Sequence, residues 1–169
     1  MRTKLCFTIL AAAILGLFMA VSLAGAETMK MRVCWHIIKA EVVPVGDVAG
    51  HVIGVVDIGG LASFDSGEIA THSHKATIDY INGSGLHENY MIYTFEDGST
   101  FVTKGQGTTT ADPGRKISLF KGSFSFIQGS GRFAGIQGSG SYTGKRFAPA
   151  AAGAEAYIDC TATYTLPPR

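Results

Sequence analysis

The sequence has few charges, few cysteines and a single tryptophan. Charged residues make up 16% of the chain, and 14 Lys and Arg are balanced by 13 Asp and Glu. The charges form neither a basic stripe nor an acidic tail, so the chain lacks the electrostatic footprint of a nucleic-acid-binding protein. We therefore expect no nucleic-acid partner.

The sequence also lacks the short motifs that hold common cofactors. It contains 22 glycines, but Gly129, Gly131 and Gly135 have the wrong spacing for a dinucleotide fingerprint, and no helical pattern follows them. A Gly-Lys-Ser/Thr phosphate loop, a nucleophile elbow and paired-cysteine metal motifs are absent as well. We expect no cofactor.

Residues 1–26 have the pattern of a signal peptide. Arg2 and Lys4 precede an apolar run from Ile9 to Val21, and the segment ends in a small-x-small sequence. Cleavage there leaves residues 27–169 as one domain without a membrane span, in a secreted or periplasmic protein. An uncleaved anchor is the alternative, and the shortness of the apolar run argues against it.

Residues 27–169 alternate between apolar and polar positions with a period of two, which predicts half-buried strands. No stretch has a convincing helical period. We expect eight strands, at 29–45, 51–58, 68–81, 86–95, 99–109, 116–128, 136–147 and 155–166.

An even number of antiparallel strands can close on itself and remove both exposed edges. The predicted fold is therefore all-β, a single closed eight-stranded antiparallel β-barrel. At this strand number the interior is either packed or holds one small ligand.

Glycines and turn residues mark the predicted strand ends. Gly59-Gly60 is expected to break the second strand, and Asp97-Gly98 predicts a type I′ hairpin turn. Glycines alternate along 138–144, which weakens a strand unless the sheet bends sharply or another group approaches closely. Strong bending again favours a closed barrel.

The segment Gly129-Ser-Gly-Arg-Phe-Ala-Gly135, followed by Gln137-Gly-Ser-Gly140, resembles the glycine-rich hairpin of the allene oxide cyclase and dirigent superfamily. Gly129, Gly131, Phe133 and Gly135 are the core of this resemblance. It implies a closed barrel, a cyclase, isomerase or stereo-directing activity, and a trimer. We carry over no catalytic residue, because no upstream segment matches that family's catalytic motifs. The turn 132–135 is predicted to plug one end of the sheet.

Two cysteines remain after signal cleavage, Cys34 and Cys160. They lie on the predicted first and last strands, which are neighbours in a closed barrel, and an exported protein reaches an oxidising compartment. We predict a Cys34–Cys160 disulfide, with two free buried thiols as the alternative.

His72, His74 and Tyr80 share one face of the third predicted strand, because residues two apart on a strand point the same way. The histidines have three possible roles: a metal site, a ligand-facing polar pair, or a structural one. A metal site would need a third ligand from elsewhere, for which the candidates are His36, His51 and Glu88.

Tyr80 is a candidate donor to a ligand carbonyl or carboxylate. Glu88 and Tyr90 on the next strand have the spacing to lie near it, and a buried Glu88 would act as a general acid or base. The alternative is that Glu88 faces solvent. Phe124 and Phe126, with Phe120 and Phe133, are predicted to line the core and cavity.

These patterns lead to three hypotheses. The first is an exported barrel that binds a small hydrophobic molecule through His72, His74, Tyr80, Phe124 and Phe126. The second, implied by the resemblance, is a cyclase, isomerase or stereo-directing enzyme, with Tyr80 and Glu88 as catalytic candidates. The third is a metal-binding protein that uses His72 and His74. The strand 29–45 is partly apolar on both faces, so we also expect a homo-oligomer that covers its outer side.

Overall fold

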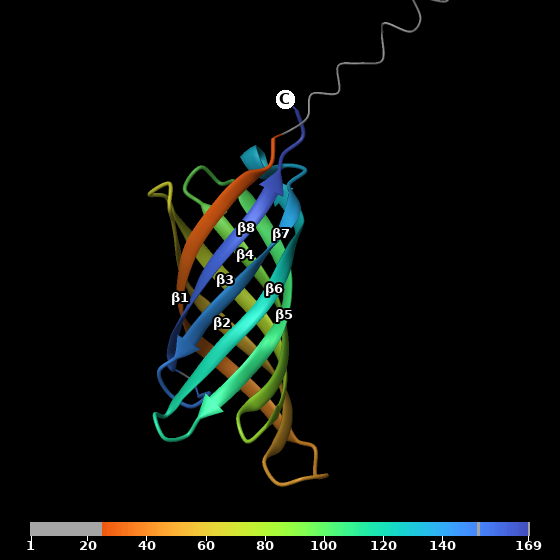
Figure 1. Ribbon diagram of the computed structural model, residues 1–169, viewed down its shortest axis with the longest axis vertical. Helices are drawn as coiled ribbons and strands as arrows, with labels where there is room; N and C mark the ends of the chain where they lie inside the picture. Colours follow the sequence, from red (N-terminus) through yellow and green to blue (C-terminus); the bar gives the residue numbers. More distant parts are fainter. Residues whose placement is uncertain (1–24, 152, 169) are drawn as a thin grey trace, which may run out of the picture.

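A computed structural model describes residues 25–151 and 153–168, so nearly all of the predicted signal peptide lies outside the described residues. The chain forms a tall barrel, and its strands run steeply across the wall (Figure 1). The elements are β1 (Glu27–Pro44), β2 (His51–Phe64), β3 (Ile69–Ile81), β4 (Ser84–Phe95), β5 (Thr100–Asp112), β6 (Ile117–Ser130), the 3₁₀ turn η1 (Gly131–Phe133), β7 (Gln137–Arg146) and β8 (Glu155–Thr165).

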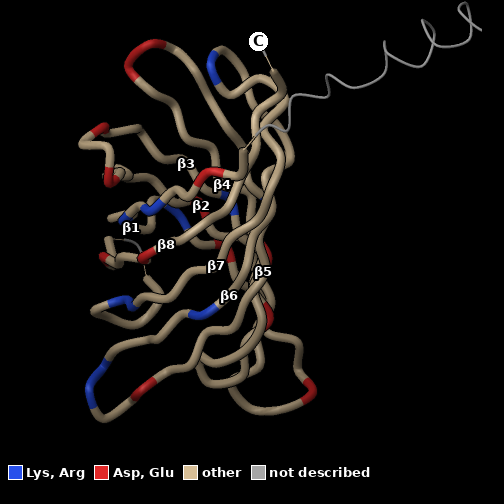
Figure 2. The backbone as a smooth tube through the Cα atoms, turned by 45° about the horizontal axis from the view of Figure 1, so that its top comes forward, with Lys and Arg blue, Asp and Glu red and all other residues tan. Residues whose placement is uncertain are grey.

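Each strand pairs antiparallel with the next, and β8 pairs antiparallel with β1. The predicted closed eight-stranded antiparallel barrel is therefore confirmed. Among the described residues no helix is long and apolar enough to cross a membrane. Acidic and basic residues occur as short, scattered segments along the tube (Figure 2).

The strict alternation of buried and exposed residues builds the core. On β1, the side chains of Met31, Val33, Trp35 and Ile37 point inward, and on β3 every second residue from Ala70 to Tyr80 does the same. The wall is therefore a single sheet, with alternate side chains facing the interior and the outside. The interior is the only large apolar core of the described chain.

Aromatic rings fill one half of the interior. Phe101 is fully buried and its ring centroid lies 4.6 Å from that of Tyr93 and 5.2 Å from that of Phe133. Phe133 belongs to η1, so the short turn does close this end of the barrel, as the sequence predicted. Arg132 covers it from outside: its guanidinium lies over the Phe133 ring and donates to Glu68 at 2.6 Å.

Two local predictions were wrong. Gly59-Gly60 does not interrupt β2. A Cβ on Gly60 would lie 2.7 Å from Cα of Trp35, so this glycine allows β1 to pack closely rather than ending a strand. The hairpin at Asp97-Gly98 exists, but only Gly98 has a positive φ, of 78°. The Gly98 amide donates to the Phe95 carbonyl, so this is a three-residue loop that ends in a left-handed glycine.

The predicted disulfide is also wrong: Cys34 and Cys160 are both free. Their strands are neighbours, as expected, but Cys34 is opposite Tyr157 and Cys160 is opposite Met31. Cys34 is exposed on the outer wall and Cys160 is buried inside. Because the two side chains lie on opposite faces of one sheet, their sulfurs cannot bond without a change of register.

Candidate functional site

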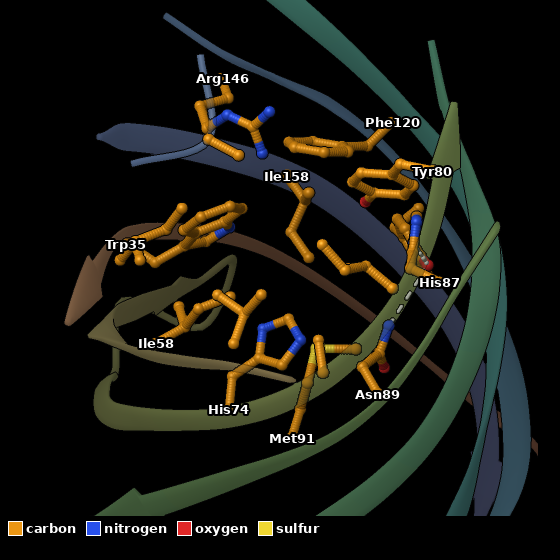
Figure 3. A pocket seen from close by; sticks show the side chains of 16 residues that line it. Trp35, Ile58, His74, Tyr80, His87, Asn89, Met91, Phe120, Arg146 and Ile158 are labelled. Atoms are coloured by element: carbon orange, nitrogen blue, oxygen red, sulfur yellow. Dashed lines mark hydrogen bonds between the residues drawn. The ribbon is translucent and has the colours of Figure 1, made fainter. Parts of the chain in front are cut away.

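A cavity of about 50 Å³ lies in the barrel interior, outside the aromatic cluster around Phe101. It lies toward the end where β7 passes into the loop before β8, since Arg146 and Ala150 belong to its lining. The close-up shows side chains from strands all around the barrel pointing into it (Figure 3). Most of the lining is apolar, and it includes Trp35, Ile58, Met91, Phe120 and Ile158.

A chain of hydrogen bonds runs along one side of the cavity. The Tyr80 hydroxyl lies 2.6 Å from Oγ1 of Thr109, which lies 3.1 Å from Nδ1 of His87. Nε2 of His87 lies 2.7 Å from the Tyr142 hydroxyl, to which Asn89 donates at 3.4 Å. All five side chains are buried, so this network ties β3, β4, β5 and β7 together through the interior.

Two glycines make the contact between His87 and Tyr142 possible. His87, Gly107, Gly122 and Tyr142 form one cross-strand row over β4, β5, β6 and β7. A Cβ on Gly107 would lie 2.6 Å from the Tyr142 hydroxyl and 2.8 Å from Nε2 of His87. The missing side chains on the two middle strands therefore leave room for the tyrosine to reach the histidine.

Burial keeps the groups of this network neutral. Desolvation lowers the pKa of His87 to about 4 and raises the pKa of Tyr142 to about 12. The pKa of Tyr80 is also raised, mainly by burial, while its hydrogen bond to Thr109 opposes the shift. At neutral pH the network thus consists of a neutral imidazole and two phenols, which can exchange hydrogen bonds with a ligand without placing a charge in the barrel.

Several polar atoms of the lining have no partner among the described residues. They are Nε1 of Trp35, both ring nitrogens of His74 and Oδ1 of Asn89. Buried polar atoms in folded proteins are nearly always hydrogen-bonded, either to protein groups or to ordered water. In the described part of the chain, three side chains with an unpartnered atom line this one cavity, and His72 and Thr103 are likewise unpartnered elsewhere in the interior.

The ligand-binding residues predicted from the sequence fall into two groups. His74 and Tyr80 line the cavity. His72 points inward but packs against Tyr93, with ring centroids 5.0 Å apart, and it is not part of the lining. Phe124 and Phe126 are buried, yet they belong to the aromatic half of the core and do not reach the cavity.

The prediction that Glu88 lies near Tyr80 was wrong. Glu88 is exposed on the outer wall, because β4 places His87 and Asn89 inside and therefore turns residue 88 outward. The solvent-facing alternative describes it correctly.

The candidate third ligands for a metal at His72 and His74 do not reach them. His36 and Glu88 are exposed on the outside of the barrel, and His51 is bound between Asp47 and Asp79 at the surface. Within residues 25–151 and 153–168, no group of three His, Cys, Asp or Glu side chains is placed to hold a metal ion.

Sequence reasoning missed His87, Asn89, Thr109, Tyr142 and Arg146. One signal was available for β4. Its alternate positions end in Met91, Tyr93 and Phe95, which marks the odd-numbered face as the inner one and so places His87 and Asn89 inside. The roles of Thr109, Tyr142 and Arg146 depend on contacts across several strands, which cannot be inferred from the pattern of a single strand.

Comparison with known proteins supports the fold. No protein-family model matches the sequence, and no curated relative is found. Several solved structures are similar, among them the following three. A conserved protein of unknown function from Rhodopseudomonas palustris is 15% identical with a TM-score of 0.54, covering 82% of this chain and 97% of its own.

The other two are pterocarpan synthase dirigent proteins. One is 15% identical with a TM-score of 0.52, covering 85% of this chain and 97% of its own. The second is 12% identical with a TM-score of 0.51, covering 88% of this chain and 96% of its own. At these identities the likeness establishes a dirigent-like barrel fold and nothing about activity.

Proposed function

We propose that this barrel binds a small, mainly apolar molecule in the cavity between Trp35, His74, Met91 and Phe120. The observation that carries the proposal is the set of unpartnered polar atoms in an otherwise apolar lining. An apolar cavity with a few convergent polar groups is the usual form of a small-molecule site, because apolar contacts supply affinity and polar groups fix orientation.

The size of the cavity limits the ligand. A volume of about 50 Å³ accommodates roughly four water molecules, at about 10–15 Å³ each. The enclosed part of the ligand is therefore small, about four non-hydrogen atoms such as a short or branched alkyl group, and the rest of a longer molecule would extend past Ala150.

Trp35 provides a direct test, because it is the only tryptophan of the sequence and it lines the cavity. Titration with propionamide, a neutral and small probe, should change the Trp35 fluorescence in a saturable manner. Native mass spectrometry of the purified protein should in addition show a co-purified small molecule. Unchanged fluorescence over the whole titration, together with a native mass equal to that of the protein alone, would contradict the proposal.

Two substitutions that add the same side chain, one inside the cavity and one outside the barrel, control for the site of binding. Ala76 lines the cavity, whereas its neighbour Thr77 is exposed on the outer wall of the same strand. Ala76→Leu should abolish the fluorescence response, and Thr77→Leu, an addition of apolar volume on the opposite face, should leave it unchanged. Equal responses in the two variants would place the probe outside the barrel.

A stereo-directing or isomerase activity is the second candidate, and the His87–Tyr142 pair favours it. A neutral imidazole 2.7 Å from a phenol can move a proton to or from a bound reactive molecule, while the cavity holds that molecule in one conformation. Turnover of an unsaturated epoxide or a phenoxyl-type substrate with one preferred enantiomer is the required result. Tyr142→Phe should remove the preference, and racemic product from the wild type would exclude this candidate for those substrates.

We propose further that a second copy of the chain covers the outer face of β1 and β2. Val43 and Ile53 are paired across these strands and are 62% and 48% exposed, and Val55 is 54% exposed nearby. Contiguous apolar surface of this kind marks an interaction site. Light scattering should give a mass above that of one chain, which Val43→Lys with Val55→Lys should reduce to the monomer value. A monomeric wild type would refute the assembly.

We also propose that the protein is exported, because residues 1–26 have the sequence pattern of a signal peptide. The intact mass of the protein recovered from a bacterial host should show that the chain begins at Glu27. Recovery of the full chain with Met1 in place would contradict cleavage.

A further inference from the structure

Arg146 is a buried cation at the end of the cavity where β7 passes into the loop before β8. It is the last residue of β7, it is only 4% exposed, and it belongs to the cavity lining. Its guanidinium lies at one end of the group of lining side chains, near Phe120 and Ile158 (Figure 3). The cationic carbon lies 5.5 Å from the centre of the Phe120 ring.

The protein partners of Arg146 are all neutral. Nε donates to the Ala148 carbonyl at 2.9 Å, and Nη2 donates to the Ser118 hydroxyl at 2.9 Å. Among the described residues, Nη1 has no hydrogen-bond acceptor and no carboxylate lies within ion-pair distance of the guanidinium.

The other arginines of the described chain behave differently. Arg32 pairs with Asp159 at 2.7 Å, Arg115 with Asp112 at 2.8 Å and Arg132 with Glu68 at 2.6 Å. All three lie nearer to solvent, where an ion pair contributes little. Arg146, the most buried of these four arginines, is thus the one without a carboxylate partner among the described residues.

A buried charge without a partner is unfavourable, because it loses hydration that neutral acceptors replace only in part. Burial accordingly lowers the pKa of Arg146 from its ordinary value, although a guanidinium keeps its proton at any physiological pH. The cavity lining contains no Asp or Glu among the described residues. The site is therefore electrostatically suited to an anion and unsuited to a cation.

We propose that Arg146 is an anion-binding subsite and that the ligand of the cavity is a compact apolar carboxylate. This inference rests on the proposed binding function and names the chemical class of its ligand. The carboxylate lies against Arg146, where Nη1 is available for a charge-assisted hydrogen bond. The apolar body of the ligand extends inward past Phe120 toward Met91.

Trp35 lines the same cavity. Its indole ring packs against the Phe120 ring, with centroids 5.7 Å apart, and its Nε1 donor is unpartnered. Arg146 and Trp35 thus both contact the Phe120 ring, and each has a donor without an acceptor among the described residues.

Propionate and propionamide test the inference, because they are small, nearly isosteric and differ in charge. At pH 7.5, Trp35 fluorescence should show propionate binding about tenfold or more tightly than propionamide, as expected for a hydrogen bond to a charged group. Arg146→Gln should remove this preference, so that the two compounds bind with equal affinity. Lys145→Gln, which removes the adjacent outward cation of β7, should keep the preference.

The outcomes separate the two proposals. If neither compound binds to the wild type, the binding function fails and the inference fails with it. If both bind equally, or if Arg146→Gln retains the preference, the inference alone is overturned and the apolar site stands.

A second measurement requires no substitution. In protein labelled with ¹⁵N-arginine, propionate should shift the side-chain Nε–H resonance of Arg146 more than propionamide does. A resonance that does not shift with propionate at saturating concentration would overturn the inference even if the Arg146→Gln variant did not fold.

Discussion

The hydroxyl of Tyr142 lies 2.7 Å from Nε2 of His87, although 55 residues and two intervening strands separate them. The bond crosses the interior above Gly107 and Gly122. It therefore links β4 directly to β7, and it lies on the side of the cavity where Tyr80, Thr109 and Asn89 also lie. The site is thus part of what holds the barrel together.

Tyr142→Phe should lower the free energy of unfolding by about 1–3 kcal/mol, because it leaves the buried Nε2 of His87 without its partner. Urea denaturation monitored by circular dichroism measures the change. Tyr157→Phe is the matched control, since Tyr157 contacts Arg32 and Phe147 on the outer wall. An equal effect of the two substitutions would show that the interior hydrogen bond contributes nothing specific.

Gly107→Ala should destabilise the barrel by about 1–3 kcal/mol, because the added methyl would overlap the Tyr142 hydroxyl and Nε2 of His87. The double variant with Tyr142→Phe should lose less than the sum of the two single changes, since removal of the hydroxyl relieves part of the clash. Denaturation of the three variants and the wild type gives the coupling. Strict additivity would contradict the proposed role of Gly107.

The fold could be predicted from the sequence because strand periodicity is a local signal. Alternation placed His72, His74 and Tyr80 together on one face, which is the inner face of β3, and eight alternating segments imply a closed antiparallel barrel. Register is not local. The offset between Cys34 and Cys160 depends on how far β8 slides along β1, and a shift by one residue reverses which side chains face each other.

The site was harder to predict for the same reason. His74 and Tyr80 were found because they share one strand, whereas His87, Thr109 and Tyr142 come together only through the pairing of four strands. Arg146 carries no sequence signal either, because a lone arginine at a strand end is usually exposed. Its importance follows from its burial and from the lack of a carboxylate among the described residues around it.

Acid should destabilise the protein through its buried histidines. Burial lowers the pKa of His72 and of His87 to about 4. The unfolded chain, with a histidine pKa near 6.5, therefore binds more protons than the folded one between about pH 6.5 and 4. This contribution to stability is complete above that window and falls by about 1.4 kcal/mol per pH unit for each histidine within it.

Variants at position 72 isolate this effect. His72→Phe, which keeps an aromatic ring against Tyr93, should reduce the loss of unfolding free energy between pH 6.5 and 5.5 by about 1 kcal/mol relative to the wild type. Urea titrations at the two pH values provide the comparison. Parallel pH profiles for variant and wild type would mean that His72 protonates in the folded barrel as readily as in the unfolded chain.

His51 should act in the opposite direction at higher pH. Hydrogen bonds to Asp79 and Asp47 raise its pKa, so the folded state holds the proton more tightly than the unfolded state does. This contribution is complete below about pH 6.5 and is lost as the pH rises through the raised pKa. His51→Gln should flatten the stability profile between pH 6.5 and 8.5 in thermal unfolding, and an unchanged slope would show that the imidazolium is not held by these carboxylates.

The two described cysteines should differ sharply in reactivity, because they lie on opposite faces of the barrel wall. Cys34 is exposed, whereas Cys160 is buried and burial raises the pKa of its thiol to about 12. Since the thiolate is the reactive form, iodoacetamide should modify Cys34 of the native protein within minutes and leave Cys160 unmodified until urea unfolds the chain. Peptide mass mapping distinguishes the two sites without interference from Cys6. A Cys34–Cys160 crosslink in the non-reduced map would contradict the register of β1 against β8, since that register places Cys160 opposite Met31.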